Sequence, residues 1–269
     1  MPRSAFVAAV GAVDWSALRS TYESGEVVRD IALRLRSLDP AEVRWAWEQI
    51  GETVLQHQGT VYPATAAAAP FLCQLALDAA TPWRAQLITE LAFLSLGHDE
   101  PYASAGTARA VRDGIRSSIG QLLGLWGTAD GGLDMALVAV SLAFPERAAA
   151  VTPRIRDWFT RSEPPLHTAL GLALAVHGAT DDAVSQVVSD EVEQDARSAA
   201  HVRRRRTPGG PYVSGLDLGP TVYSPVLGAT QLAARLRAGE DPENDEFSCV
   251  YSLLLNLMGY GRNLIDHPR

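Results

Sequence analysis

The side chains with the clearest chemical potential are a histidine, a glutamine and a tyrosine grouped in one predicted turn. His57 and Gln58 lie at the end of a predicted helix, and Tyr62 follows shortly after Gly59. An imidazole, an amide and a phenol at this spacing can form the polar mouth of a pocket on the inner face of a helical array. The alternative is a capping turn, in which His57 bonds the last carbonyls of the helix and Tyr62 packs between helices.

A second polar group, formed by His98, Asp99 and Glu100, lies in a predicted loop between helices. A histidine beside carboxylates can act as an acid and a base, or bind a divalent metal. Residues adjacent in sequence seldom point at one ion, and no second cluster has ligand spacing, so we expect no metal. The alternative is a solvated loop whose acids help to cap the next helix. The candidates for catalysis are therefore His98 and Asp99, together with His57 and Tyr62.

Four consecutive arginines, Arg203, Arg204, Arg205 and Arg206, form a basic segment that Tyr212 and Tyr223 follow. Such a segment can bind a phosphate group or an acidic partner. The alternative is a solvated loop that balances an acidic stretch upstream. Adjacent guanidinium groups repel one another unless something neutralises them, so the segment stays a candidate for binding, as does Gln58.

Six tryptophans are spread along the chain, and most fall on apolar stripes, where core packing explains them. Trp45 and Trp47 differ by about 200° around a helix axis, so they cannot face the same neighbour. One of the two should lie closer to the surface, where tryptophans are enriched among binding hot spots. Trp45 is therefore a further candidate for binding.

The elements that position these residues are predicted to be helices. Apolar residues recur at helical spacing, alanine and leucine are abundant, and no strand-like alternation competes. The helical hairpins return at roughly 40-residue intervals, the period of HEAT and armadillo units. We therefore expect an all-α chain, folded over 1–269 as one HEAT-like α-solenoid of roughly five hairpins. An irregular loop is expected over 202–225, and capping helices over 226–258.

Caps, prolines and glycines give individual boundaries. Asp14 is expected to cap a first helix, and single helices are expected over 104–126 and 146–161. The other predicted helices cover about 26–38, 40–57, 63–77, 82–96, 132–143, 165–176, 182–201, 226–237 and 245–258.

Charge and motifs narrow the range of partners. All 23 basic residues are arginine, and the net charge is −8. A protein that coats nucleic acid needs a basic face, so nucleic-acid binding is not expected, whereas acidity suits a basic partner protein. No apolar run reaches the ~18 residues of a membrane span, and the N-terminus imitates a signal peptide poorly, so we expect a cytoplasmic protein without a membrane partner. No dinucleotide-binding or phosphate-binding motif is present, and we expect no cofactor.

Several short segments are distinctive as a set: Val13–Leu18 with Tyr22, Leu38–Pro40, His57–Thr65 and Ala69–Leu72, with looser additions at Leu96–Glu100 and Ala143–Glu146. Together they resemble a group of actinobacterial HEAT-repeat proteins, of which the run His57–Thr65 is the most specific part. The resemblance implies an α-solenoid and, most often, a protein-binding role, in immunity or regulation, or a place in a biosynthetic gene cluster. It implies no catalytic residues and does not extend past His201.

Three functions are open at this point. The first is a protein-binding module that acts on a cytoplasmic partner. The second is a small-molecule-binding protein or biosynthetic enzyme, with residues 203–225 as a lid over a pocket that contains His57, Tyr62, His98 and Asp99. The third, ranked last because of the net charge of −8, is a HEAT-like DNA glycosylase.

Overall fold

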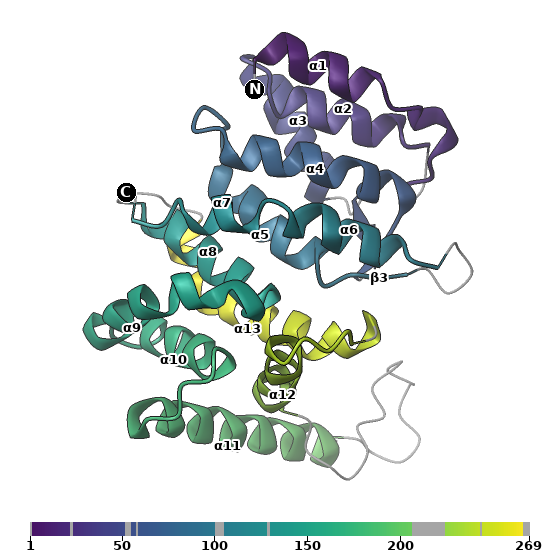
Figure 1. Cartoon of the computed structure of the whole chain (residues 1–269). Helices are drawn as coiled ribbons and strands as arrows, with labels where there is room; N and C mark the ends of the chain where they lie inside the picture. The colour runs from purple at the N-terminus through teal and green to yellow at the C-terminus, as the bar shows by residue number, and fades with distance from the viewer. Residues whose placement is uncertain are drawn as a thin grey trace.

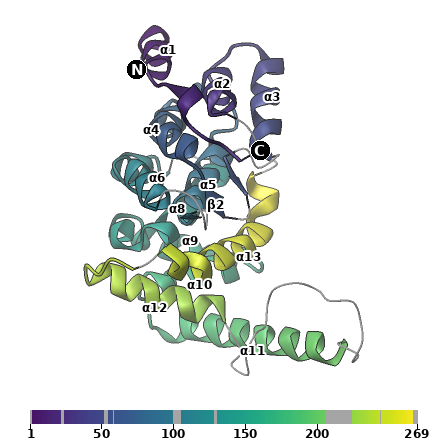
Figure 2. The ribbon, with the colours of Figure 1, turned by 90° about the vertical axis from the view of Figure 1, so that its right-hand side faces the viewer.

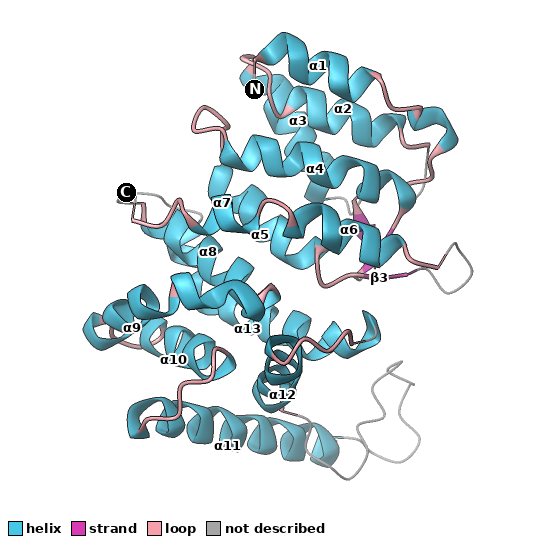
Figure 3. Cartoon of the chain, viewed as in Figure 1, coloured by secondary structure: helices cyan, strands magenta, loops and turns pink. Residues whose placement is uncertain are grey.

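The computed structural model describes residues 2–21, 24–51, 55–57, 59–99, 105–127, 130–205, 224–242 and 244–265. Most of them are helical (Figure 3), which confirms the expectation of an all-α chain. The α-helices are, in chain order, α1 (Arg3–Gly11), α2 (Glu26–Arg34), α3 (Pro40–Gly51), α4 (Pro63–Leu77), α5 (Arg84–Leu94), α6 (Thr107–Arg116), α7 (Ile119–Leu123), α8 (Gly131–Ala143), α9 (Thr152–Arg161), α10 (Leu166–Val176), α11 (Asp182–Arg205), α12 (Pro225–Arg237) and α13 (Ser248–Ile265).

The helices form a stack with α1 at one end and α11 at the other (Figure 1). Consecutive helices pack as pairs, such as α4 with α5 and α9 with α10, and next-but-one helices also touch, such as α4 with α6 and α10 with α12. One continuous set of buried apolar side chains runs through these contacts. In α10 every side chain from Ala169 to Val176 is buried, as expected for a helix that is apolar on all sides.

Several predicted helices have different boundaries in the structure. The helix expected over 40–57 is α3, which ends at Gly51, and His57, expected at its end, lies in a strand. Asp14 begins only the short 3₁₀ turn η1 (Trp15–Ala17), and its carboxylate accepts a hydrogen bond from the Ser16 hydroxyl at 2.7 Å. The helix expected over 104–126 is broken into α6 and α7 by the turn at residues 117–118. The helix expected over 146–161 begins as the 3₁₀ segment η2 (Pro145–Ala150) and becomes α-helical only at α9.

Three short strands, which the sequence pattern did not predict, join two inter-helix turns. They are β1 (Gln56–His57), β2 (Thr60–Val61) and β3 (His98–Asp99). β1 pairs with β2 in antiparallel fashion, and β2 pairs with β3 in parallel, with Thr60 opposite His98. The sheet therefore fixes the turn after α3 against the turn after α5, although the two are far apart in sequence.

Gly97 lies where the chain enters β3, and a side chain there has no room. An added Cβ would lie 2.5 Å from Cγ1 of Val61 and 3.0 Å from the Gly59 carbonyl oxygen. We expect Gly97→Ala to lower the free energy of unfolding by roughly 1–3 kcal/mol in urea denaturation followed by circular dichroism. Gly120→Ala is the control, because nothing lies within 4 Å of its added Cβ and alanine is the better helix former. Equal stability of the two variants would contradict the steric account.

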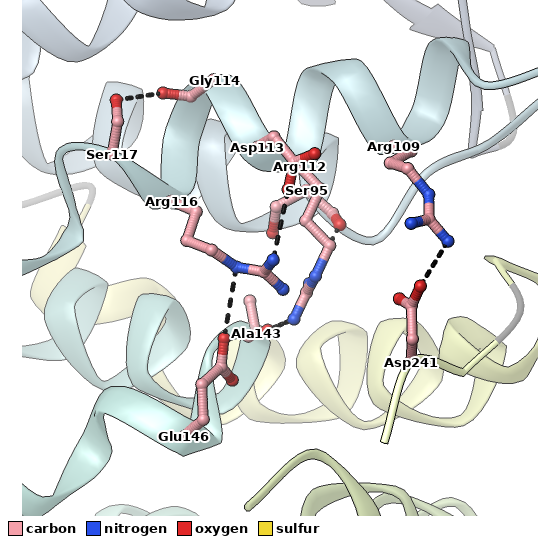
Figure 4. A network of polar contacts seen from close by, with 10 residues as sticks. All are labelled: Ser95, Arg109, Arg112, Asp113, Gly114, Arg116, Ser117, Ala143, Glu146 and Asp241. Carbon is pink, nitrogen blue, oxygen red and sulfur yellow. Dashed lines mark hydrogen bonds and ion pairs between the residues drawn. The ribbon is translucent and has the colours of Figure 1, made fainter. Parts of the chain in front are cut away.

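A buried arginine ties α6 to its neighbours (Figure 4). Arg112 is only 5% exposed, and its guanidinium donates hydrogen bonds to the carbonyls of Ser95 (3.2 Å) and Ala143 (2.8 Å). The same group lies 4.4 Å from the ring centroid of Phe144 and 4.3 Å from that of Phe247, which belongs to the 3₁₀ segment η3 (Asn244–Phe247). Burial lowers the pKa of Arg112 to about 10, so the guanidinium is still charged at neutral pH.

Two further arginines of α6 form ion pairs that are more exposed to solvent. Nε of Arg116 lies 3.5 Å from a carboxylate oxygen of Glu146 in η2. Arg109, one turn before Arg112, forms an exposed ion pair with Asp241 at 2.6 Å. The arginines of Figure 4 therefore differ in solvent exposure. Arg112 is enclosed by the protein, whereas Arg109 is exposed.

The C-terminal part of the chain differs from the expected loop and cap. α11 continues through Arg205, so the expected loop over 202–225 begins inside a helix, and residues 206–223 lie outside the described residues. α13 packs against α8, α5 and α12 in the middle of the molecule (Figure 2) rather than closing the end of the stack. Among the described helices, none combines the length and the apolar character that crossing a membrane requires.

Candidate functional site

The small sheet brings together three of the four residues proposed for catalysis. His57 belongs to β1, and His98 and Asp99 form β3. Tyr62 follows β2 directly but is buried, with the guanidinium of Arg19 lying 6.0 Å from its ring centroid. The burial of Tyr62 agrees with the alternative expectation, that its ring packs between helices.

Asp99 acts as a helix cap. One of its carboxylate oxygens accepts the backbone N–H of Gly106 at 2.7 Å, and the other accepts that of Ala108 at 2.7 Å. These donors belong to the start of α6, where the helix leaves N–H groups without internal partners. The prediction that acids of this loop cap the next helix is confirmed for Asp99, whereas Glu100 lies outside the described residues.

His98 is held by both its backbone and its side chain. Its N–H donates to the Gly59 carbonyl at 2.9 Å, and Nε2 lies 3.0 Å from the hydroxyl of Thr60. The imidazole lies over Gly59, whose φ of +85° favours glycine and whose added Cβ would come within 3.2 Å of the ring. A hydroxyl that is hydrogen-bonded to an imidazole can pass its proton to the ring, so the geometry of Thr60 and His98 is suited to proton transfer.

Glu90 of α5 and Gln56 of β1 join this group, and sequence reasoning missed both. Nε2 of Gln56 donates to a carboxylate oxygen of Glu90 at 3.3 Å, while Oε1 of Gln56 is buried without a hydrogen-bond partner. Burial raises the pKa of the half-buried Glu90 to about 7, and the Gln56 hydrogen bond only partly offsets it. A carboxyl group with this pKa can both take up and release a proton at neutral pH.

Tyr251 of α13 completes the polar group from a distant part of the chain. Its ring packs edge-on against Phe93 at 5.2 Å, and its Cε2 lies 3.9 Å from where a Cβ on Gly59 would be. Burial raises the pKa of the Tyr251 phenol, and the charge of Glu90 raises it further. No local pattern connects Tyr251 with Glu90, because only packing of α13 against α5 brings them together.

The other predicted binding residues that the structure describes lie on helices and not in the sheet. The Arg34 guanidinium lies 4.2 Å from the ring centroid of Trp45, whereas Trp47 packs edge-on against Trp83 at 5.9 Å. Trp45 and Trp47 thus face different neighbours, as predicted, but both are half-buried, and the exposed tryptophan is Trp83, at 46%. Arg203, Arg204 and Arg205 belong to α11. Four predicted residues lie outside the described residues, namely Gln58, Arg206, Tyr212 and Tyr223.

A groove of about 780 Å³ lies between the start of α10 and one face of α11. Its floor is shaped by Pro164 and Pro165, and by His167, whose ring stacks on Phe159. Its α11 wall combines the apolar Ala183 and Val187 with polar and charged side chains, namely Gln186, Asp190, Glu191, Gln194 and Arg197. Sequence reasoning noted these acids only as counter-charges to the arginine run, and nothing in the local pattern indicated a groove.

No group of three or more histidine, cysteine, aspartate or glutamate side chains in the described parts of the chain is placed to hold a metal ion. Comparisons of the chain with protein-family models, with curated proteins and with solved structures returned no match. The described residues thus offer two features of chemical interest. One is the sheet cluster, formed by Gln56, His57, Glu90, His98, Asp99 and Tyr251, and the other is the α10–α11 groove.

Proposed function

We propose that this chain is a HEAT-like α-solenoid that binds a basic segment of a partner protein in the α10–α11 groove. The pairing of consecutive helices and the contacts between next-but-one helices support a stack of hairpins, the arrangement that gives solenoids their extended binding surfaces. The seating of α13 in the middle of the stack is a departure from a simple repeat array.

The observation that carries the proposal is the polar face of α11, which the other described residues leave exposed. The helix buries Val184, Val187 and Glu191, spaced at i, i+3 and i+7, toward its neighbours. On the groove side, Gln186, Asp190 and Gln194 are exposed. A helix face with three exposed polar side chains along a groove offers hydrogen bonds to the backbone and side chains of an incoming peptide.

The charge of the groove favours a basic occupant. Asp190 contributes an exposed carboxylate to its wall and Glu191 a buried one, whereas the guanidinium of Arg197 lies 3.9 Å from Glu193, an acid outside the groove. Asp190 is oriented by Gln186, whose amide donates to its carboxylate at 2.8 Å. The net charge of −8 adds long-range attraction for a basic partner.

Panning a random peptide display library on the purified protein tests this proposal. Enriched peptides should carry lysine or arginine, and their affinity should fall as salt is raised. Asp190→Lys should weaken a selected peptide by at least about tenfold, because it places a like charge opposite the ligand.

Glu48→Lys is the matched control, because Glu48 is an exposed acid on α3, far along the stack, and the change in net charge is the same. It should leave the peptide affinity within about twofold of the unchanged protein. Enrichment of peptides without basic residues, or equal losses in the two variants, would argue against the groove.

A further inference from the structure

A second recess lies away from the α10–α11 groove, between Trp126 and the start of α8 on one side and one face of α9 on the other. Its volume is about 500 Å³, within the range of small-molecule sites. Four of its lining residues, Arg154, Asp157, Trp158 and Arg161, are spaced at i, i+3, i+4 and i+7 along α9, so they share one face of that helix. Trp126, which precedes α8, and Asp134 of α8 also line it.

The aromatic part of this recess is a pair of tryptophans. The ring centroids of Trp126 and Trp158 are 6.1 Å apart, and the ring planes are nearly perpendicular, at 83°. Both side chains are only partly buried, whereas the side chains that α9 buries in the core are Ile155 and Phe159. The core therefore does not use up the indole surfaces, and part of them faces the recess.

The charged side chains of the recess include both signs, and each is held by a hydrogen bond or an ion pair. Arg154 donates to the Trp126 carbonyl at 3.0 Å, and Arg161 pairs with Asp157. One oxygen of Asp134 accepts the N–H of Gly127 at 3.0 Å. Burial nevertheless raises the pKa of Asp134, which means that its carboxylate has fewer stabilising donors than water would provide.

Two carboxylates and two guanidinium groups give these walls no formal net charge. A ligand with a net charge would be attracted by one pair of these groups and repelled by the other, so each attraction comes with the penalty of a repulsion. A neutral ligand whose groups both donate and accept hydrogen bonds meets no such penalty, because carboxylates accept from hydroxyls and guanidinium groups donate to them. Flat apolar C–H faces complement the indole rings by dispersion.

We propose that this recess is a binding site for a neutral pyranose sugar. One C–H face of the sugar ring stacks on an indole, and the ring hydroxyls donate to Asp134 and Asp157 and accept from Arg154 and Arg161. The site does not depend on the α10–α11 groove, so peptide binding and sugar binding stand or fall separately.

Saturation-transfer NMR of the full-length protein tests the site, with the methyl glycosides of glucose, galactose, mannose and N-acetylglucosamine as probes. Sorbitol, which has the hydroxyls but no ring, is the control compound. We expect transfer to ring C–H protons of at least one glycoside and none to sorbitol. Absence of transfer to all four glycosides, or equal transfer to sorbitol, would overturn the proposal.

Variants locate the binding. Trp158→Leu should weaken the glycoside by roughly two- to tenfold, the loss of one aromatic contact, whereas Trp83→Leu, which removes an exposed tryptophan outside the recess, should not change it. Arg161→Ala removes an exposed hydrogen-bond donor without touching the core, and should also weaken binding, so the test survives if Trp158→Leu fails to fold. Unchanged affinity in folded Trp158→Leu and Arg161→Ala would place the sugar elsewhere and refute the assignment.

Discussion

Replacing Arg112 with alanine should lower the free energy of unfolding by about 2–5 kcal/mol, because two buried carbonyls lose their donor at about 1–3 kcal/mol each. The change deletes both hydrogen bonds to the carbonyls of Ser95 and Ala143, which leaves these two acceptors unpaired. It also leaves a gap between the rings of Phe144 and Phe247. Urea denaturation followed by far-UV circular dichroism measures the loss.

Arg109→Ala is the matched control for this experiment. It removes the same type of side chain from the same helix one turn earlier, but the side chain of Arg109 is 61% exposed and its ion pair with Asp241 is solvated. We expect a loss of less than about 1 kcal/mol there. If Arg112→Ala were no less stable than Arg109→Ala, the buried guanidinium would not be what joins α6 to α8 and η3.

A second large effect is expected from Glu90, and it depends on pH. The pKa of Glu90 is about 7 in the folded chain and 4.5 as the ordinary value, so protonated Glu90 suits the fold better than ionised Glu90 does. This contribution to stability is fully present below pH 4.5 and is lost as the pH rises through 7. The shift corresponds to about 3 kcal/mol at pH 8.

Glu90→Gln, which imitates the protonated carboxyl, should therefore be more stable than the unchanged protein by up to about 3 kcal/mol at pH 8 and about equal to it near pH 4. Urea denaturation at a series of pH values measures this difference. Glu48→Gln, at an exposed position on α3, should show no such trend. A stability difference for Glu90→Gln that stays constant from pH 4 to pH 8 would contradict the raised pKa.

The parts of the fold that the sequence predicted well are those set by local pattern. α4, α8 and α10 lie close to their predicted bounds, because apolar periodicity and flanking prolines and glycines act within a few residues. The strands escaped prediction because each has two residues, too few for an alternation to be read. Their stability comes from pairing across the chain, with Thr60 opposite His98.

The sheet cluster was predictable only in part for the same reason. His57 and His98 stood out as chemically able residues in turns, but nothing local showed that the two turns meet. In the sequence Glu90 is an ordinary acid on a predicted helix. Its raised pKa comes from burial, which the hydrogen bond from Gln56 only partly offsets. Asp99 shows the converse case, since a residue type suited to catalysis is used to cap α6.

The position of α13 also affects how the chain is made. In a linear repeat array, each new unit completes its core against the preceding one, so folding can follow synthesis from the N-terminus. Here α8 and α5 need α13 to cover them, and α13 is synthesised long after they have left the ribosome. During that interval the nascent chain carries the apolar surface of α5 and α8 that α13 later covers, the kind of transiently exposed surface that favours aggregation.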